Sequence, residues 1–299
     1  MSSERLASTS TPAHGQVRSG SRFKRIAWRY SRNRPAVVAM AFLTVLIIVA
    51  ILAPLAAPYD PVVQDLPRRL EPPSREFLLG TDAFGRDSFS RMIYGARVSL
   101  LVAFATVALI ILIGTTVGIL AAYYRLLDGP LMRIVDLLMA MPPLFLLIML
   151  VALFGASTGH TVLFIALSYW RTTARYVRGQ VLSLKHRDYV KAALASGASD
   201  LRIFVRHIIP NISDGLIVIA TLSISFVILL ETALSYLGLG AQPPTPSWGG
   251  MLADGRQYLQ ISWWLTVFPG LAIFLTVMAF NFVGDGLRDA FDSRSAKAV

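Results

Sequence analysis

The residues of this sequence that could do chemistry are few and scattered. The four histidines, His14, His160, His186 and His207, lack the spacing of a metal-ligand set. Cysteine is absent, which excludes disulfides, thiolate metal sites and a cysteine nucleophile. No Ser-His-Asp arrangement and no pair of carboxylates at a catalytic spacing can be argued. We therefore expect no catalytic site, no metal and no cofactor on this chain.

Three charged residues remain as candidates for a transport role. Glu231 is the charge expected inside an apolar segment, where carboxylates are costly and often functional. It lies only about one to two turns from the end of that segment, as judged from the 3.6-residue period. A gate or pathway role and a structural hydrogen bond therefore stay equally open for it. Asp254 and Arg256 belong to a Pro/Gly-rich loop and could form part of an outer gate.

The composition is that of a multi-span membrane protein. The 299 residues are 55% hydrophobic and only 15% charged, with a mean hydropathy of +0.60, whereas about a quarter of a soluble domain is charged. The net charge of +11 could suggest nucleic acid. Membrane proteins, however, gather Lys and Arg in their cytoplasmic loops, so the bilayer and not nucleic acid is the expected partner.

Six apolar segments are predicted to cross the membrane as helices. They cover residues 35–57, 98–124, 130–154, 160–173, 212–237 and 261–284. The segments rich in Lys and Arg then fall on one side, together with both termini, which the positive-inside rule places in the cytoplasm. The sequence thus predicts an all-α membrane protein with six transmembrane helices and cytoplasmic N- and C-termini.

This topology divides the chain into segments with different surroundings. An interfacial helix is expected over 87–97, because Phe89, Met92, Ile93 and Ala96 share one face. The segments are a basic cytoplasmic N-terminal segment 1–34, a first transmembrane helix 35–57, an extracytoplasmic segment 58–97, a transmembrane domain 98–286 with a cytoplasmic loop 175–210, and a cytoplasmic tail 287–299.

Small residues and prolines should shape the transmembrane helices. Gly114 and Gly118 are four apart, which lets two helices approach closely. The pattern is common by chance, so we interpret it as a packing feature. Pro142 and Pro143 must interrupt the backbone hydrogen bonds of the third apolar segment, which predicts a kink there.

The cytoplasmic loop contains a predicted helix-turn-helix. An Ala-rich helix over 189–196 should end at Gly197, which tolerates the left-handed backbone of a helix terminus. Ser199 and Asp200 suit the start of a second helix, and Pro210 should stop that helix before the next span.

The second helix of the loop has an apolar stripe. Leu201, Phe204, Val205 and Ile208 follow the helical spacing i, i+3, i+4, i+7. The stripe could face the protein's own spans, as in an ordinary amphipathic connector, or a partner protein. Periodicity alone does not decide between the two.

The loop also resembles a known motif. Ala192 and Ala193, Gly197 four residues on and Pro210 thirteen further resemble the EAA loop of ABC-importer permeases, in the dipeptide/oligopeptide/nickel subfamily and its C-type subunit. Lys191 departs from the pattern, since the family usually has Glu there. Three further blocks resemble the same subunit in the right order, at 79–100, 238–252 and 268–292.

The resemblance implies a fold, partners and a mechanism. It implies the type I ABC importer permease fold, with 98–286 as its transmembrane domain. It implies a heterodimer with a homologous permease, two ABC ATPase subunits that hold ATP and magnesium, and an extracytoplasmic substrate-binding protein in a bacterial inner membrane. The contact tip is expected at residues 197–202. The residues implied to form the ATPase-coupling loop are Lys191, Ala192, Ala193, Gly197, Ala198, Ser199, Asp200, Leu201, Arg202, Arg206, His207 and Pro210.

Several alternatives stay open at this stage. A stand-alone ion-coupled transporter would need buried charge pairs or broken helices at mid-membrane, and only Glu231 and the 142–143 kink qualify. A membrane enzyme or receptor has no supporting constellation. Asp82, Arg86 and Arg91 could pair with each other or meet the binding protein. The cargo is open among dipeptides, longer peptides, nickel chelates, glutathione and sugars.

Overall fold

The computed structural model describes residues 22–292 and builds them almost entirely from helices. An isolated bridge between Thr81 and Asp87 is the extent of β-structure in that range. The predicted segments 1–34 and 287–299 therefore lie partly outside the described residues. The helices are α1 Arg22–Arg32, α2 Arg34–Ile51, α3 Ala53–Ala56, α4 Ser88–Tyr123, α5 Arg125–Ala140, α6 Pro143–Phe154, α7 Thr158–Leu184, α8 Asp188–Ala195, α9 Asp200–Ile203, α10 Ile209–Tyr236, α11 Trp248–Gly255 and α12 Trp264–Phe291.

Four helices of the described chain are long and apolar enough to cross a membrane. They are α2, α4, the run from α9 through α10, and α12, and the bent pair of α5 and α6 passes the same test as a fifth. The predicted span at 160–173 lies within α7, which is 27 residues long but carries Arg171, Arg175 and Arg178. The structure therefore supports a multi-span helical protein with four or five clear spans, whereas the sequence predicted six.

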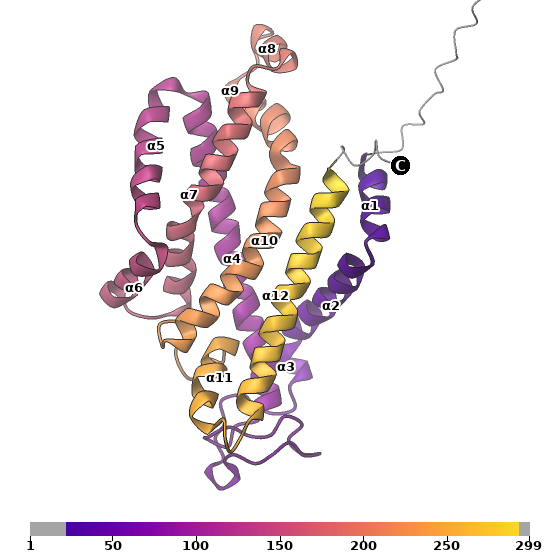
Figure 1. Ribbon diagram of the computed structural model, residues 1–299, viewed down its shortest axis with the longest axis vertical. Coiled ribbons are helices and arrows are strands. Elements are labelled where there is room, and N and C mark those ends of the chain that lie inside the picture. Colours follow the sequence, from indigo (N-terminus) through magenta and orange to yellow (C-terminus); the bar gives the residue numbers. More distant parts are fainter. Residues whose placement is uncertain (1–21, 293–299) are drawn as a thin grey trace, which may run out of the picture.

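The helices run between two ends of the molecule, which we name the α8 end and the α11 end (Figure 1). The α8 end holds α1, α8, α9 and the C-terminal end of α12, and the α11 end holds α3, α11 and the loop 57–87. Helix α12 packs against both α10 and α2, while α4 packs most extensively against α7. Both ends of the described chain thus lie at the same end as the predicted cytoplasmic loop.

The predicted interfacial helix over 87–97 is not a separate element. These residues form the first turns of α4, a single helix of 36 residues. Asp87 caps it, since its carboxylate accepts from the Ser90 backbone N–H at 2.8 Å and from the Ser90 hydroxyl at 2.6 Å. No proline interrupts the chain after this cap, so the helix continues directly into the apolar run. Arg91 is buried within the protein there.

Two glycines of α4 lie against α7. A Cβ atom built on Gly114 would stand 2.6 Å from the Thr173 Cβ, and one built on Gly118 would stand 2.6 Å from the Ala174 carbonyl oxygen. Real Cβ atoms do not approach so closely, so only glycine permits this helix spacing. The two positions therefore set the distance between α4 and α7.

The proline pair breaks the third apolar segment more strongly than a kink. Helices α5 and α6 meet at 90°, with Pro142 in an extended conformation and Pro143 as the first residue of α6. Two successive residues without an N–H cannot continue the hydrogen bonds of α5, and a proline is well tolerated in the first turn of the next helix.

Candidate functional site

Residues 188–208 comprise α8, α9, the turn between them and the π-helical turn that follows, and we name them the coupling segment. They have the helix-turn-helix geometry expected from the sequence. Gly197 has a φ of +77°. Its N–H donates to the Leu194 carbonyl at 2.9 Å, and the Ala198 N–H donates to the Ala193 carbonyl at 3.1 Å. This is a Schellman ending, in which a left-handed residue lets two N–H groups reach back to the last carbonyls of the helix.

The tip of the coupling segment faces open space. A Cβ atom on Gly197 would have no neighbour within 4 Å, and Leu201 is 70% exposed. Of the twelve residues predicted to form the ATPase-coupling loop, four are half-buried, namely Ala193, Ala198, Asp200 and His207, and the other eight are exposed. An exposed leucine beside a fixed glycine turn leaves an apolar surface available for a partner.

Asp200 ties the coupling segment to the end of α4. Its two carboxylate oxygens accept from the hydroxyls of Tyr123 at 2.8 Å and Tyr124 at 2.7 Å. The Tyr123 ring also packs edge-on against Phe204, with ring centroids 4.8 Å apart. The hydrogen bond to Asp200 raises the pKa of Tyr124 above its ordinary value. Sequence reasoning missed both tyrosines, because nothing in their spacing links them to residue 200.

The predicted stop at Pro210 is wrong. The helical run continues from Asp200 to Tyr236, passing through a π-helical turn at Phe204–Ile208. The N–H of Ile209 donates to the Phe204 carbonyl five residues back, and the Asn211 side chain donates to the His207 carbonyl at 2.6 Å. A single π turn can be inserted within an α-helix, and here it lies just before the proline, so the helical run continues past Pro210.

The π turn also divides the predicted apolar stripe. Ile208 is fully buried, as is Ile203, which the stripe did not include. Leu201 and Val205 are exposed, at 70% and 58%. The extra residue per turn changes which side chains share a face, so a 3.6-residue period assigns the stripe incorrectly.

Glu231 lies in a polar cluster between three helices. It is 1% exposed and accepts hydrogen bonds from Ser235 at 2.7 Å and from Ser99 of α4 at 3.3 Å. Ser247, which caps α11, lies 3.5 Å from the Ser235 hydroxyl. The Trp248 N–H in turn donates to the Ser99 hydroxyl at 3.4 Å. The cluster therefore joins α4, α10 and the start of α11 around one carboxylate.

Substitution of Glu231 tests how much this cluster stabilises the fold. Glu231→Ala removes the shared acceptor and leaves buried hydroxyls unpaired, so we expect it to lower the free energy of unfolding by about 1–3 kcal/mol. Glu231→Gln keeps one acceptor oxygen and should lose less. Thr232→Val is the matched control, because the Thr232 hydroxyl is buried without a partner in the described chain. Thermal unfolding in detergent measures all three, and equal losses for Glu231→Ala and Thr232→Val would contradict the assignment.

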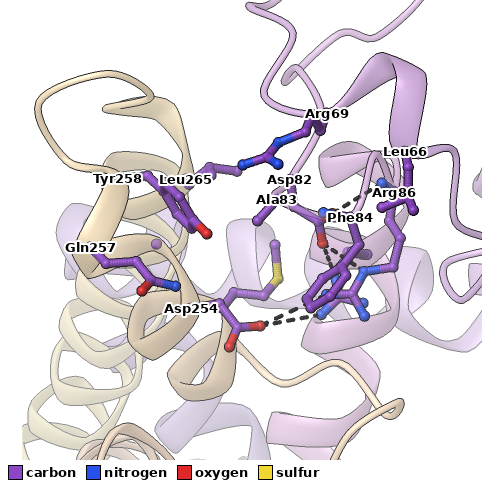
Figure 2. A pocket seen from close by; sticks show the side chains of 13 residues that line it. Leu66, Arg69, Asp82, Ala83, Phe84, Arg86, Asp254, Gln257, Tyr258 and Leu265 are labelled. Atoms are coloured by element: carbon purple, nitrogen blue, oxygen red, sulfur yellow. Dashed lines mark hydrogen bonds and ion pairs between the residues drawn. The ribbon is translucent and has the colours of Figure 1, made fainter.

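At the α11 end, Asp254 faces two buried arginines across a cavity of about 400 Å³. Figure 2 shows Asp254 on one wall and Asp82 and Arg86 on the other. Arg91, which also lines the cavity, is 4% exposed. Arg256 does not join this group, since its guanidinium lies 5.3 Å from the centre of the Tyr236 ring. The structure thus separates the two residues that the sequence proposed for an outer gate.

Helix α7 contributes charges that the sequence analysis passed over. Arg175 pairs with Asp136, and Arg178 donates to Asp128 at 2.6 and 2.7 Å, so both join α7 to α5. Arg171 is 5% exposed, and its Nη1 atom has no hydrogen-bond partner in the described chain. Arg171 lies inside the predicted span 160–173, and a charge within a span is costly and often functional, so the sequence did contain a signal for this residue.

Among residues 22–292, no group of three His, Asp or Glu side chains could hold a metal ion. The coupling segment, the buried Glu231 cluster and the cavity at the α11 end are therefore the candidate sites.

Comparison with known proteins identifies the family. Residues 114–297 match the model of the binding-protein-dependent transport system inner membrane component, and residues 21–73 match the N-terminal transmembrane domain of oligopeptide transport permease C. The chain is 46% identical to the dipeptide transport system permease protein DppC of Escherichia coli K12, over 89% of this chain and 92% of that protein. It is 42% identical to the di/tripeptide permease DppC of Pseudomonas aeruginosa, over 90% and 91%.

Other relatives and solved structures extend the comparison. The glutathione transport system permease protein GsiD of Pectobacterium atrosepticum is 42% identical, with 89% of each chain covered. A chain of the MetNI methionine ABC transporter, solved in inward facing conformations, is similar in fold with a TM-score of 0.56 and 18% identity, over 68% of this chain and 98% of that one. The chain therefore belongs to the family of binding-protein-dependent transport system inner membrane components and is a permease subunit of an ABC importer.

Proposed function

We propose that this permease imports dipeptides or other short peptides and is driven through its coupling segment by ATPase subunits. The exposed tip around Gly197, held rigidly to α4 by Asp200, is the observation that carries the proposal. The names of several relatives support the cargo class, since they are dipeptide, di/tripeptide and glutathione permeases.

The proposed assembly follows the same reasoning. The chain would pair with a homologous permease, bind two ATPases that hold ATP and magnesium, and receive peptide from an extracytoplasmic binding protein. The α8 end would face the cytoplasm of a bacterial cell and the α11 end its exterior, with six crossings of the inner membrane. The grouping of both described chain ends with the coupling segment supports this orientation.

The geometry provides a path for mechanical force. The helix from Asp200 to Tyr236 has 37 residues, which corresponds to about 55 Å at 1.5 Å per residue. It begins in the coupling segment and ends beside α11. A displacement of its first turn by closing ATPases would therefore reach the opposite membrane face as a rigid-body motion.

Two substitutions at Gly197 test the docking role. Because the residue is left-handed and faces open space, Gly197→Val should strain the backbone by about 1–2 kcal/mol and distort the tip. Gly197→Asn tolerates the same backbone conformation and serves as the matched control. We expect the ATPases to co-purify with the Gly197→Asn permease at the wild-type level and to be lost with Gly197→Val.

The result that contradicts this proposal is equally specific. If the ATPases remain bound to a folded Gly197→Val permease and peptide import is unchanged, the coupling segment is not the docking site. Peptide uptake by the purified chain in liposomes without any ATPase would instead support a secondary transporter.

A further inference from the structure

The cavity at the α11 end carries a net positive charge. Its volume is about 400 Å³, and its charged lining consists of three arginines and two aspartates: Arg69, Arg86, Arg91, Asp82 and Asp254. One positive charge is therefore left over when both aspartates are ionised. A second cavity of about 360 Å³, toward the loop 238–250, also reaches Arg86, Arg91 and Asp254. The paired guanidiniums thus lie where two cavities meet.

Asp82 fixes the orientation of both buried arginines. Its Oδ2 atom accepts from Arg86 Nε at 2.7 Å and lies 3.3 Å from Arg91 Nε. Its Oδ1 atom accepts from the backbone N–H groups of Phe84 at 2.9 Å and of Arg86 at 3.0 Å. Asp82 therefore holds both guanidiniums through their Nε atoms, and the terminal Nη atoms remain available for other contacts. Arg91 Nη1 donates to the Pro61 carbonyl at 3.2 Å.

The remaining terminal nitrogens converge on Asp254 without closing a hydrogen bond. Nη2 of Arg86 and Nη2 of Arg91 each lie 3.9 Å from the same oxygen, Oδ2 of Asp254. This separation is beyond hydrogen-bond length, and the Asp254 side chain is 54% exposed. Partial burial raises the pKa of Asp254, although both arginines oppose the rise. Asp254 is thus a loosely held counter-ion for two rigidly held cations.

We propose that Arg86 and Arg91 form a carboxylate-binding site that receives the C-terminal carboxylate of an incoming peptide, and that Asp254 occupies this site when no peptide is present. Two prearranged guanidiniums bind a carboxylate more strongly than a single ammonium group does. The cavity is concave and partly open, as a site for a small ligand should be. That the carboxylate belongs to a peptide rests on the proposed function, whereas the existence of a carboxylate-binding site does not.

Exchange of Asp254 for a peptide carboxylate would remove the link from α11 to Arg86 and to Arg91 of α4, while the contact between Trp248 and Ser99 remains. Asp254 lies in the last turn of α11, and Ser247 caps its first turn. Ser247 is joined through Ser235 to Glu231 on α10, which continues to the coupling segment. The site therefore lies at one end of a chain of contacts whose other end is the proposed ATPase docking surface.

A charge-selective labelling experiment tests the site directly, because the sequence has no cysteine to interfere. Ala83→Cys places a thiol on the cavity wall, and Val63→Cys, 65% exposed on the same loop, is the control position. Each is combined with Asp254→Asn in the full complex in nanodiscs. The thiols react with a sulfonate-bearing or a trimethylammonium-bearing methanethiosulfonate reagent.

With Asp254 neutralised, the sulfonate reagent should react about tenfold faster at Ala83→Cys, since one unit of opposing charge is removed within a few ångströms of the arginines. The trimethylammonium reagent should not be accelerated, and neither rate should change at Val63→Cys. Dialanine at millimolar concentration should slow the sulfonate reaction, whereas dialanine amide should not. Gln257→Cys, on the opposite wall, provides a second reporter with the same expectations.

Three outcomes would overturn the proposal. Sulfonate rates that Asp254→Asn leaves unchanged at both reporters would show that the arginines offer no anion site. Equal protection by dialanine and its amide would show that the carboxylate is not recognised. Protection by peptide-free binding protein, with none by dialanine, would assign the arginines to a protein contact. These results are independent of ATPase docking at Gly197, so failure of this site and failure of the proposed function can be told apart.

Discussion

Asp200→Ala is expected to reduce ATP-driven peptide import by about tenfold or more while the permease still folds and reaches the membrane. The carboxylate accepts two tyrosine hydroxyls that join the coupling segment to the end of α4, and hydrogen bonds to a charged acceptor are stronger than those between neutral groups. Without them, the tip can move when the ATPases close and α4 no longer has to follow it. Import in proteoliposomes, measured beside ATP hydrolysis, separates uncoupling from loss of assembly.

Two further variants make the Asp200 test specific. The double variant Tyr123→Phe/Tyr124→Phe removes the same two hydrogen bonds from the other side and should reproduce the uncoupling. Asp188→Asn is the matched control, because Asp188 is an exposed carboxylate in the first turn of α8. Import that survives Asp200→Ala and the double variant unchanged would show that the link to α4 does not transmit the motion.

Gly118→Ala is expected to destabilise the permease by about 1–3 kcal/mol, the usual cost of overpacking a close contact. The added methyl group would stand 2.6 Å from the Ala174 carbonyl oxygen and 2.7 Å from the Val177 Cβ. Since one of these atoms belongs to the backbone of α7, the two helices must separate. Gly118→Leu should prevent folding. Thermal unfolding of the purified complex measures the shift.

Gly179→Ala is the matched control for this effect. Gly179 also lies in a long helix, α7, but its Cβ would have no neighbour within 4 Å. There the substitution should be neutral or stabilising by up to about 1 kcal/mol, because alanine favours a helix more than glycine does. A fall in melting temperature as large as that of Gly118→Ala would show that helix propensity, and not the α4–α7 contact, decides both results.

The sequence determined the membrane class, the family and the position of the coupling segment. Long uncharged runs indicate membrane spans. In a bilayer such a run must be helical, because a helix satisfies its own backbone hydrogen-bonding groups. Four blocks in order identified the permease family, which the comparisons confirmed. The left-handed turn at Gly197 was also predictable, since glycine between two helical patterns is a local signal.

Local signals gave the wrong result at two places, for different reasons. Pro210 predicts a helix end when only its neighbours are considered, yet a π turn and the Asn211 side chain carry the helix through it. Residues 87–97 have the apolar face of an interfacial helix, but their polar face, including Arg91, is buried against the loop that contains Pro61. At Pro210 the deciding feature is a change of helical period among neighbouring residues, whereas at 87–97 the deciding partner lies 30 residues away.

The candidate sites themselves depended on the tertiary structure. Glu231 and Ser99 are 132 residues apart, and Asp200 and Tyr123 are 77 apart, yet each pair shares a hydrogen bond. Asp254 and Arg91 lie far apart in the chain as well, and only the packing of α11 beside α4 brings their charges to 3.9 Å. Sequence spacing specifies helices because their contacts are local. Pairing between helices depends on how they pack, which no single segment encodes.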